Sequence, residues 1–137
     1  MSDNQQIAHE IDRVMRKIDA QMHRRMPAVD EGRIGPMGAL LLMQLESMEP
    51  CSIQAVATAI GRDNSQLTRL IRSLEKKGVL RVERNETDRR SKTLTLTAEG
   101  RHFLLHAKKT LAEVVEAIVE PLDATDKRSL LAILGKL

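Results

Sequence analysis

The fold is decided by residues 62–78, RDNSQLTRLIRSLEKKG, which have the pattern of one capped helix with a buried side and a polar side. The apolar residues recur at i, i+3, i+4 and i+7, the spacing that lines one face of an α-helix, and they are Leu67, Leu70, Ile71 and Leu74. Asp63 suits the N-cap, with Gln66 three residues later, and Gly78 after two lysines is a typical stop. Helical winding places the polar side chains opposite the leucines or on their flanks: Ser65, Gln66, Thr68, Arg69, Arg72 and Lys76.

This polar side has the chemistry that the major groove of B-DNA accepts. Arginine and glutamine can each form two hydrogen bonds with the edge of one base, while serine and threonine can bind bases or phosphates. An ordinary surface helix with a solvated charged face has the same pattern. The stretch alone therefore leaves both interpretations open.

Composition predicts one folded domain with a local positive charge. The chain has 137 residues, of which 42% are hydrophobic and 30% charged. Residues 62–92 contain ten Lys and Arg against five Asp and Glu, a net charge of +5, whereas the rest of the chain carries twelve against fourteen, a net of −2. Such a local excess is typical of a nucleic-acid footprint. One Phe, with no Trp or Tyr, gives no platform for stacking unpaired bases, so we expect a double-stranded partner.

Several other classes of protein are disfavoured. The chain shows neither a secretory signal nor an apolar run of membrane-spanning length, so we expect a cytoplasmic protein without a membrane partner. A Gly-rich phosphate loop and a nucleophile–base pairing are missing, and we expect no enzyme and no cofactor. His102 and His106 lack a third metal ligand, so no metal site is expected. The single cysteine, Cys51, excludes a disulfide framework; near a helix start its thiol could be mildly acidified, although an inert packing role is the commoner one.

The central part of the chain has the pattern of a winged helix-turn-helix. A helix from Pro36 to about Met48 is apolar on most of its circumference, which predicts central burial. Ser52 can cap a short helix that Gly61 ends, directly before the helix capped by Asp63. The runs VLRVER (79–84) and KTLTLT (92–97) alternate and are separated by NETDRRS, which predicts a β-hairpin with a charged tip. A basic hairpin directly after a helix-turn-helix is a wing, and it favours DNA binding over the solvated-surface interpretation.

Long amphipathic helices flank this centre. One covers residues 5–26, another begins after a Thr97 cap and runs to about Glu120, and Thr125 opens a terminal helix. Their apolar stripes are narrow, as in helices that pack along one side against another helix, which predicts a homodimer. The side chains expected to dimerise are Ile7, Ile11, Leu111, Ile118, Leu130 and Leu134. The predicted fold class is mainly α with a small β-hairpin wing (α+β): a single domain over 1–137, with the winged helix-turn-helix at 34–97 and dimerisation helices at 5–27 and 98–137.

The stretch SIQAVATAIGRDNSQLTRLIRSLEKKGVLRVERNETDRRSKTLTLTAEG, residues 52–100, resembles the MarR family of bacterial winged-helix transcription regulators. The resemblance implies a homodimer on a pseudo-palindromic duplex, with a recognition helix that places five side chains at the major groove: Ser65, Gln66, Thr68, Arg69 and Arg72. The family's Asp-x-Arg wing motif falls on Asp88 and Arg90. Arg90 would enter a minor groove, and Arg89 could replace it. Asp88 would brace an arginine, nucleate the turn, or do both.

The expected function is a sequence-specific double-stranded DNA-binding transcriptional regulator, most often a repressor in this family. Arg84 and Lys92 at the hairpin base are expected to contact phosphates. A small anionic or phenolic effector would release the DNA, and His9, His23 and Arg24 lie near where the family's ligand cleft would open. The alternative is a winged-helix protein-interaction module that binds an acidic partner.

Overall fold

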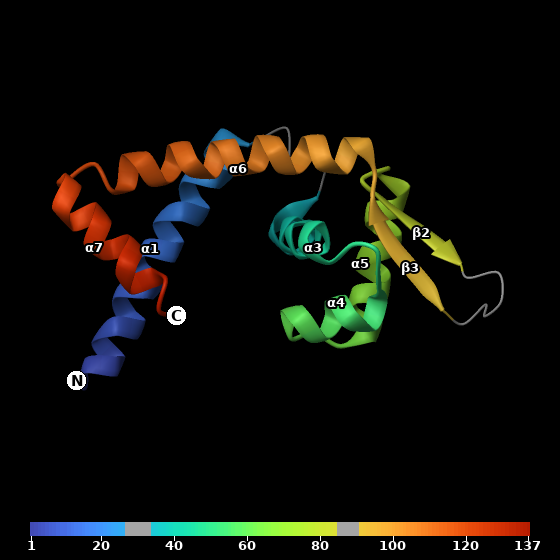
Figure 1. Ribbon diagram of the computed structural model, residues 1–137, viewed down its shortest axis with the longest axis horizontal. Coiled ribbons are helices and arrows are strands. Elements are labelled where there is room, and N and C mark those ends of the chain that lie inside the picture. The colour runs from blue at the N-terminus through green and yellow to red at the C-terminus, as the bar shows by residue number, and fades with distance from the viewer. Residues whose placement is uncertain (27–33, 85–90) are drawn as a thin grey trace. The chain divides into compact units, whose positions relative to one another are not determined.

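The computed structural model describes residues 1–26, 34–84 and 91–137 (Figure 1). Its elements in chain order are α1 (Asp3–Arg25), α3 (Gly35–Met48), β1 (Cys51–Ser52), α4 (Ile53–Ile60), α5 (Asn64–Lys76), β2 (Leu80–Arg84), β3 (Lys92–Leu96), α6 (Ala98–Ile118) and α7 (Ala124–Leu134). They form two units: one contains Met1–Met26 and Lys108–Leu137, and the other lies between residues 34 and 107. The predicted class, mainly helical with a small hairpin, is confirmed.

Caps set the boundaries of α4 and α5 as predicted. The Ser52 hydroxyl accepts a hydrogen bond from the Ala55 amide at 3.1 Å, and Gly61 ends α4 in the left-handed region at φ 69°. The Asp63 carboxylate accepts from the Gln66 amide at 2.9 Å, and Gly78 after α5 has φ 77°. A side chain with a Cβ rarely adopts that backbone conformation, which explains glycine at both stops.

The core of the winged-helix unit is built from one side of each helix and one face of the sheet. Its fully buried side chains include Leu41, Leu42, Leu45, Val56, Leu67, Leu74, Leu80, Leu94 and Leu104. The predicted central burial of α3 holds for one side of the helix only. The buried residues of α3 share that side, and they are Gly38, Leu41, Leu42 and Leu45. On the opposite side Leu40 is 45% exposed and Met43 41% exposed.

The predicted hairpin is confirmed in its strands, and it belongs to a three-stranded antiparallel sheet of order β1-β3-β2. The sequence did not predict β1, because two residues are too few to show alternation. In the β2–β3 register, Leu80 pairs with Leu96, Val82 with Leu94 and Arg84 with Lys92. Since successive side chains alternate between faces, these three pairs share one face. Residues 85–90, which contain the predicted wing tip, lie outside the described residues.

A hydrogen-bonded junction joins the hairpin to α6. Thr97 caps this helix as predicted, since its hydroxyl accepts from the Gly100 amide at 3.1 Å and donates to the Gly78 carbonyl at 2.6 Å. The Thr97 amide also donates to the Val79 carbonyl at 3.3 Å. The end of α5, the start of β2 and the start of α6 are therefore held at one point.

The terminal helices differ from prediction at their ends. The N-cap of α7 is Asp123, not Thr125: the Asp123 carboxylate accepts from the Asp126 amide at 2.8 Å, and the Asp126 carboxylate reaches back to the Asp123 amide. Two bonds in this capping box outcompete a single threonine hydroxyl. At its other end α6 stops at Ile118, two residues before the predicted Glu120. Neither α1 nor α7 buries a residue, and no described helix combines the length and the apolar character needed to cross a membrane.

Candidate nucleic-acid interface

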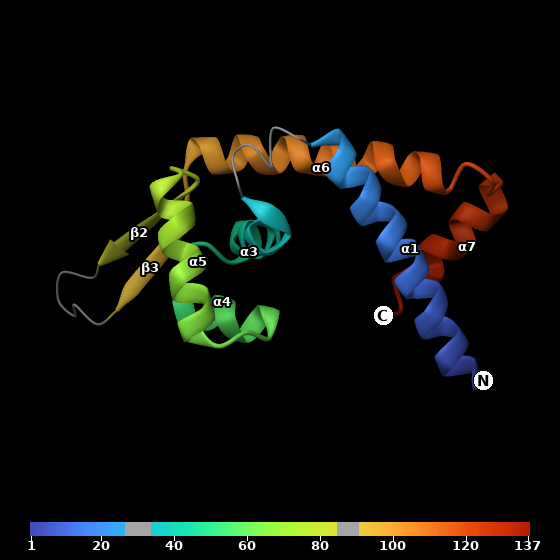
Figure 2. The same cartoon turned by 180° about the vertical axis from the view of Figure 1, so that it is seen from behind.

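Helix α5 presents its polar side to solvent. The side chains of Ser65, Gln66, Arg69 and Arg72 are exposed and that of Thr68 is half-buried, while Leu67, Ile71 and Leu74 are buried. Figure 2 shows α5 along one side of the winged-helix unit, with the hairpin beside it. All five recognition residues predicted on this helix therefore lie where a duplex could reach them.

The first turn of α5 restricts what two of these side chains can offer. The Ser65 hydroxyl donates to Asp63 Oδ1 at 2.7 Å, and the Thr68 hydroxyl donates to the Asn64 carbonyl at 2.7 Å. Each hydroxyl has one hydrogen, so in this arrangement both oxygens are left only as acceptors. The Ser65 hydroxyl, together with the Gln66 amide, also lowers the pKa of the Asp63 carboxyl. Asp63 is therefore ionised at neutral pH, at the helix end where a negative charge is favourable.

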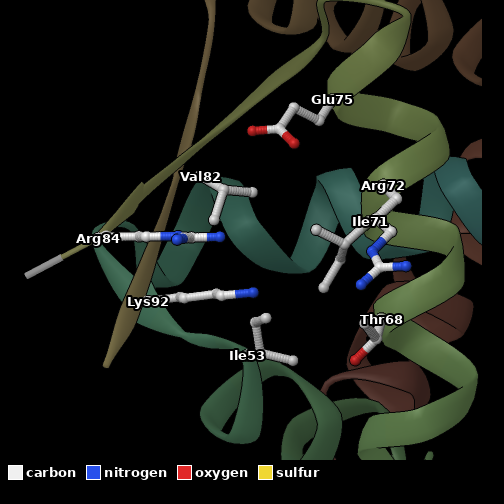
Figure 3. Close-up of a pocket in the computed structure, with 8 residues that line it drawn as sticks. All are labelled: Ile53, Thr68, Ile71, Arg72, Glu75, Val82, Arg84 and Lys92. Atoms are coloured by element: carbon white, nitrogen blue, oxygen red, sulfur yellow. The ribbon is translucent and has the colours of Figure 1, made fainter. Parts of the chain in front are cut away.

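The hairpin turns a cationic surface toward α5. Arg84 and Lys92 are register partners, and Figure 3 shows them extending side by side from the strands toward the helix. They line a pocket of about 180 Å³ together with Thr68, Arg72 and Glu75 of α5. The apolar side chains in its lining are Ile53, Ile71 and Val82.

The charges of this pocket are unbalanced. Three cations, Arg72, Arg84 and Lys92, face one carboxylate, that of Glu75, and no ion pair within 4.0 Å joins any of the four to another described residue. Like charges directly opposite each other on neighbouring strands repel, so the Arg84–Lys92 pair disfavours the hairpin in the free protein. An anion in the pocket would relieve this repulsion.

The opposite face of the hairpin is different in character. Arg81 pairs with Thr95 and Glu83 with Thr93, and Arg81 lies 3.9 Å from Glu83 in an exposed ion pair. In β2 and β3, the cations without an ion pair to a described residue therefore lie on the face that meets α5. Of the predicted wing residues, Arg84 and Lys92 lie on that face, while Asp88, Arg89 and Arg90 lie outside the described residues.

Sequence reasoning missed four side chains of the pocket. They are Ile53, Ile71, Glu75 and Val82, which come from three different elements, and only tertiary pairing brings these elements together. A signal for Glu75 was present, because it lies three residues after Arg72 on α5 and so shares its side of the helix. The hairpin pairing could also have predicted that Arg84 and Lys92 lie opposite each other.

The predicted dimerisation residues belong to the other unit and are mostly exposed. Ile7 is 55% exposed and Ile11 50% on α1; Leu134 is 55% and Leu130 36% on α7. Leu111 and Ile118 on α6 are half-buried. Exposed apolar side chains that lie together are typical of surfaces that bind another protein.

Other candidate side chains do not form a site in the described residues. For Cys51, the less favoured alternative of an acidified thiol is contradicted, because burial, and next to it the charge of Glu49, raise the pKa of its thiol. His9, His23 and Arg24 are exposed on α1, and His102 and His106 are exposed on α6. Within 1–26, 34–84 and 91–137, no three His, Cys, Asp or Glu side chains are arranged to hold a metal ion.

Comparison with known proteins gives one consistent result. A model described as the MarR family matches residues 39–92. The transcriptional regulator SarZ of Staphylococcus haemolyticus is 30% identical over 61% of this chain, and the transcriptional repressor MprA of Escherichia coli K12 is 32% identical over 72% of it. The aligned part spans 54% of SarZ and 57% of MprA, little more than half of each relative.

Solved structures share the fold across nearly the whole chain. The repressor CouR bound to a 23-mer DNA duplex superposes with a TM-score of 0.74 at 24% identity, covering 94% of this chain and 89% of CouR. Apo MarR from Escherichia coli gives a TM-score of 0.79 at 19% identity, covering 94% and 93%. BpsR of Bordetella bronchiseptica, whose DNA binding is regulated by 6-hydroxynicotinic acid, gives 0.74 at 20% identity, covering 99% and 95%. These likenesses show the winged-helix fold.

Proposed function

Because the chain belongs to the MarR family, we propose that it is a sequence-specific double-stranded DNA-binding transcriptional regulator that acts as a repressor. One observation carries the proposal: the polar side of α5 is exposed, and the hairpin face beside it supplies further cations. Such a surface combines base-reading groups with phosphate-binding groups, and sequence-specific DNA recognition needs both.

In this proposal, the N-terminal part of α5 reads base edges in the major groove. Gln66 and Arg69 are exposed. A glutamine can form two hydrogen bonds with adenine, and an arginine can form two with guanine. The hydroxyls of Ser65 and Thr68 already donate within the helix, so they would accept hydrogen bonds from exocyclic amino groups of cytosine or adenine. The side chains at the start of α5 would therefore specify sequence.

The pocket cations would bind the DNA backbone. Arg72 from α5 and Arg84 and Lys92 from the hairpin line one pocket, and a phosphate bound there would replace their mutual repulsion by attraction (Figure 3). From the family resemblance, Arg90 or Arg89 at the wing tip would enter a minor groove, with Asp88 bracing the arginine. Residues 34–97 form the DNA-binding region in this proposal.

We propose that residues 5–27 and 98–137 pair two copies of the chain. The exposed apolar side chains of α1 and α7 support this, since pairing would cover Ile7, Ile11, Leu130 and Leu134. A two-fold dimer suits a pseudo-palindromic operator whose half-sites lie about one helical turn apart. The same arrangement lets a small anionic or phenolic effector, as BpsR has, act by favouring one dimer state over another.

The relatives are transcriptional regulators rather than enzymes, and we propose no catalytic activity here. A bacterial regulator of this kind meets its DNA in the cytoplasm, which is the location we propose. The rival function, a module that binds an acidic protein, would use the same cations but would not need exposed Gln66 and Arg69 beside them.

Selection of bound duplexes from a random pool tests the function directly. A palindromic consensus should emerge, and the affinity for it should fall steeply with salt. Gln66→Ala or Arg69→Ala should cost about 1–3 kcal/mol and relax preference at one base pair. Arg84→Ala should weaken all duplexes about equally, and the matched control Arg81→Ala, on the opposite face of the hairpin, should change little.

Two outcomes would contradict the proposal. Failure of the protein to bind any duplex at low salt would favour the acidic-protein module. Equal losses on all sequences for the Gln66, Arg69 and Arg84 variants would refute the division between base reading and phosphate binding. A separate variant, Leu111→Glu, tests the dimer: its mass in solution should be that of a monomer. An unchanged mass would show that the pairing surface lies elsewhere.

A further inference from the structure

Glu75 is an acidic side chain in a place where the proposed function requires cations. It is exposed on α5, and its carboxylate is the only one among the described residues that line the pocket with Arg72, Arg84 and Lys92. Figure 3 shows Glu75 reaching from the helix toward the strands above these three side chains. A phosphate that binds there must approach this negative charge.

Of the acidic residues that the structure describes near the pocket, two others have local structural roles. Asp63 caps α5 through its bonds with Ser65 and Gln66, and Glu83 pairs with Arg81 on the opposite face of the hairpin. The Glu75 carboxylate has no such bond with any described residue: the hydrogen bond from the Gly78 amide goes to the Glu75 backbone carbonyl, and no ion pair within 4.0 Å includes Glu75. Neither a cap nor a specific ion pair therefore explains its position.

We propose that Glu75 lowers the affinity of the protein for DNA. Its carboxylate repels a duplex phosphate that binds in the α5–hairpin pocket, so the protein dissociates from DNA more readily. The inference rests on the proposed function, because it concerns the same pocket. A regulator must leave non-specific DNA readily, and phosphate contacts supply most of the non-specific affinity. One carboxylate beside three cations lowers that affinity without removing any of the contacts.

The same charge has the opposite effect on the free protein. Without DNA, Glu75 offsets the mutual repulsion of Arg72, Arg84 and Lys92 across the pocket, and it lies at i+3 from Arg72, a spacing at which opposite charges attract. When a phosphate enters, it takes over this role, and the carboxylate becomes a like charge next to it. Glu75 therefore stabilises the free winged-helix unit and weakens the bound state.

Because Glu75 is expected to stabilise the free protein but to weaken DNA binding, its removal should change the two in opposite directions. The test is Glu75→Gln, which keeps the size of the side chain and removes its charge. We expect this variant to bind both the selected operator and a random duplex about two- to fivefold more tightly, the size of one like-charge repulsion partly screened by water. The slope of log affinity against log salt should become no shallower, because the number of phosphate contacts is unchanged. Its unfolding midpoint without DNA should fall.

Two matched variants separate the pocket from general electrostatics. Glu83→Gln removes the same charge from an exposed side chain on the opposite face of the hairpin and should leave duplex affinity and salt slope unchanged. Glu75→Asp retains the charge and should bind DNA as the wild type does. A merely structural role for Glu75 would lower stability and affinity together in Glu75→Gln.

The inference is overturned if Glu75→Gln binds duplexes no more tightly than wild type, or if Glu83→Gln gains as much. Wild-type binding is measured first, so failure of the inference is distinguishable from failure of the proposed function. If wild type binds a selected duplex and Glu75→Gln shows no gain, only the role of Glu75 falls. If wild type binds no duplex at low salt, the DNA-binding proposal falls and the role of Glu75 falls with it.

Discussion

Replacement of Gly100 by alanine should destabilise the winged-helix unit, although alanine is the better helix former. A Cβ at this position in the first turn of α6 would lie 2.0 Å from the Val79 carbonyl oxygen and 3.0 Å from its carbon, whereas ordinary contact begins at 3.4 Å. Both of these atoms belong to the backbone, so no side chain can rotate away. The start of α6 and the start of β2 would have to separate instead.

The cost follows from what joins these two segments. Separation would stretch the bond from the Thr97 amide to the Val79 carbonyl at 3.3 Å and that from the Thr97 hydroxyl to the Gly78 carbonyl at 2.6 Å. Each is worth about 1 kcal/mol, and overpacking costs a further ~1–3 kcal/mol. Alanine in a helix recovers about 1 kcal/mol. The net loss in the free energy of unfolding is about 2–4 kcal/mol.

Urea and thermal unfolding followed by circular dichroism measure this loss. For a chain of this size, we expect the midpoint of thermal unfolding to fall by about 10 °C. Gly135→Ala is the matched control, because Gly135 has φ −66° and its Cβ would meet nothing closer than the Leu131 carbonyl oxygen at 3.3 Å. A Gly100→Ala protein within ~0.5 kcal/mol of wild type would refute the reasoning.

Three further predictions concern single side chains. Lys92→Thr should raise the stability of the free protein by about 0.2–1 kcal/mol, because it ends the cross-strand repulsion with Arg84. It should also reduce the slope of log duplex affinity against log salt by about one. A loss of stability together with a loss of affinity would contradict this prediction. The pKa of Asp63 is lowered in the folded protein, so its stabilising effect is present above the ordinary value of 3.8 and is lost as pH falls through the folded pKa. Asp63→Asn should accordingly show a flatter decline of unfolding midpoint than wild type below about pH 4, and identical declines would count against the cap. Burial raises the pKa of the Cys51 thiol, so iodoacetamide should modify native protein more slowly than urea-unfolded protein at pH 8, a result that equal rates would contradict.

The features that local chemistry dictates could be predicted from the sequence. Ser52, Asp63 and Thr97 cap helices at the predicted positions, and Gly61 and Gly78 take the left-handed conformations that their places after helices imply. Each depends on neighbours within a few residues. The alternation in the hairpin was equally local and predicted its two strands.

The features that depend on tertiary context could not be predicted. Nothing in the α3 sequence shows that Leu40 and Met43 face solvent, because that depends on which side the other elements cover. The pKa of Cys51 depends on tertiary context for the same reason: proximity to α4 in the chain left an acidified thiol as an alternative, but burial and Glu49 raise its pKa. On α5, helical winding alone could predict which polar side chains lie opposite the leucines, whereas Glu75 became part of the pocket only when β2 and β3 were placed beside it.

One strand register controls both the core and the candidate site. The face of the hairpin that carries Leu80 with Leu96 and Val82 with Leu94 continues, two residues further along each strand, into Arg84 with Lys92. A slip of one residue in β3 would turn Thr93 and Thr95 inward and move Lys92 to the opposite face, because side chains alternate with period two. Burial of Leu94 and Leu96 makes that slip costly. The apolar pairs of the hairpin therefore determine which face carries Arg84 and Lys92, and Leu94→Ala should weaken DNA binding without changing a charged group.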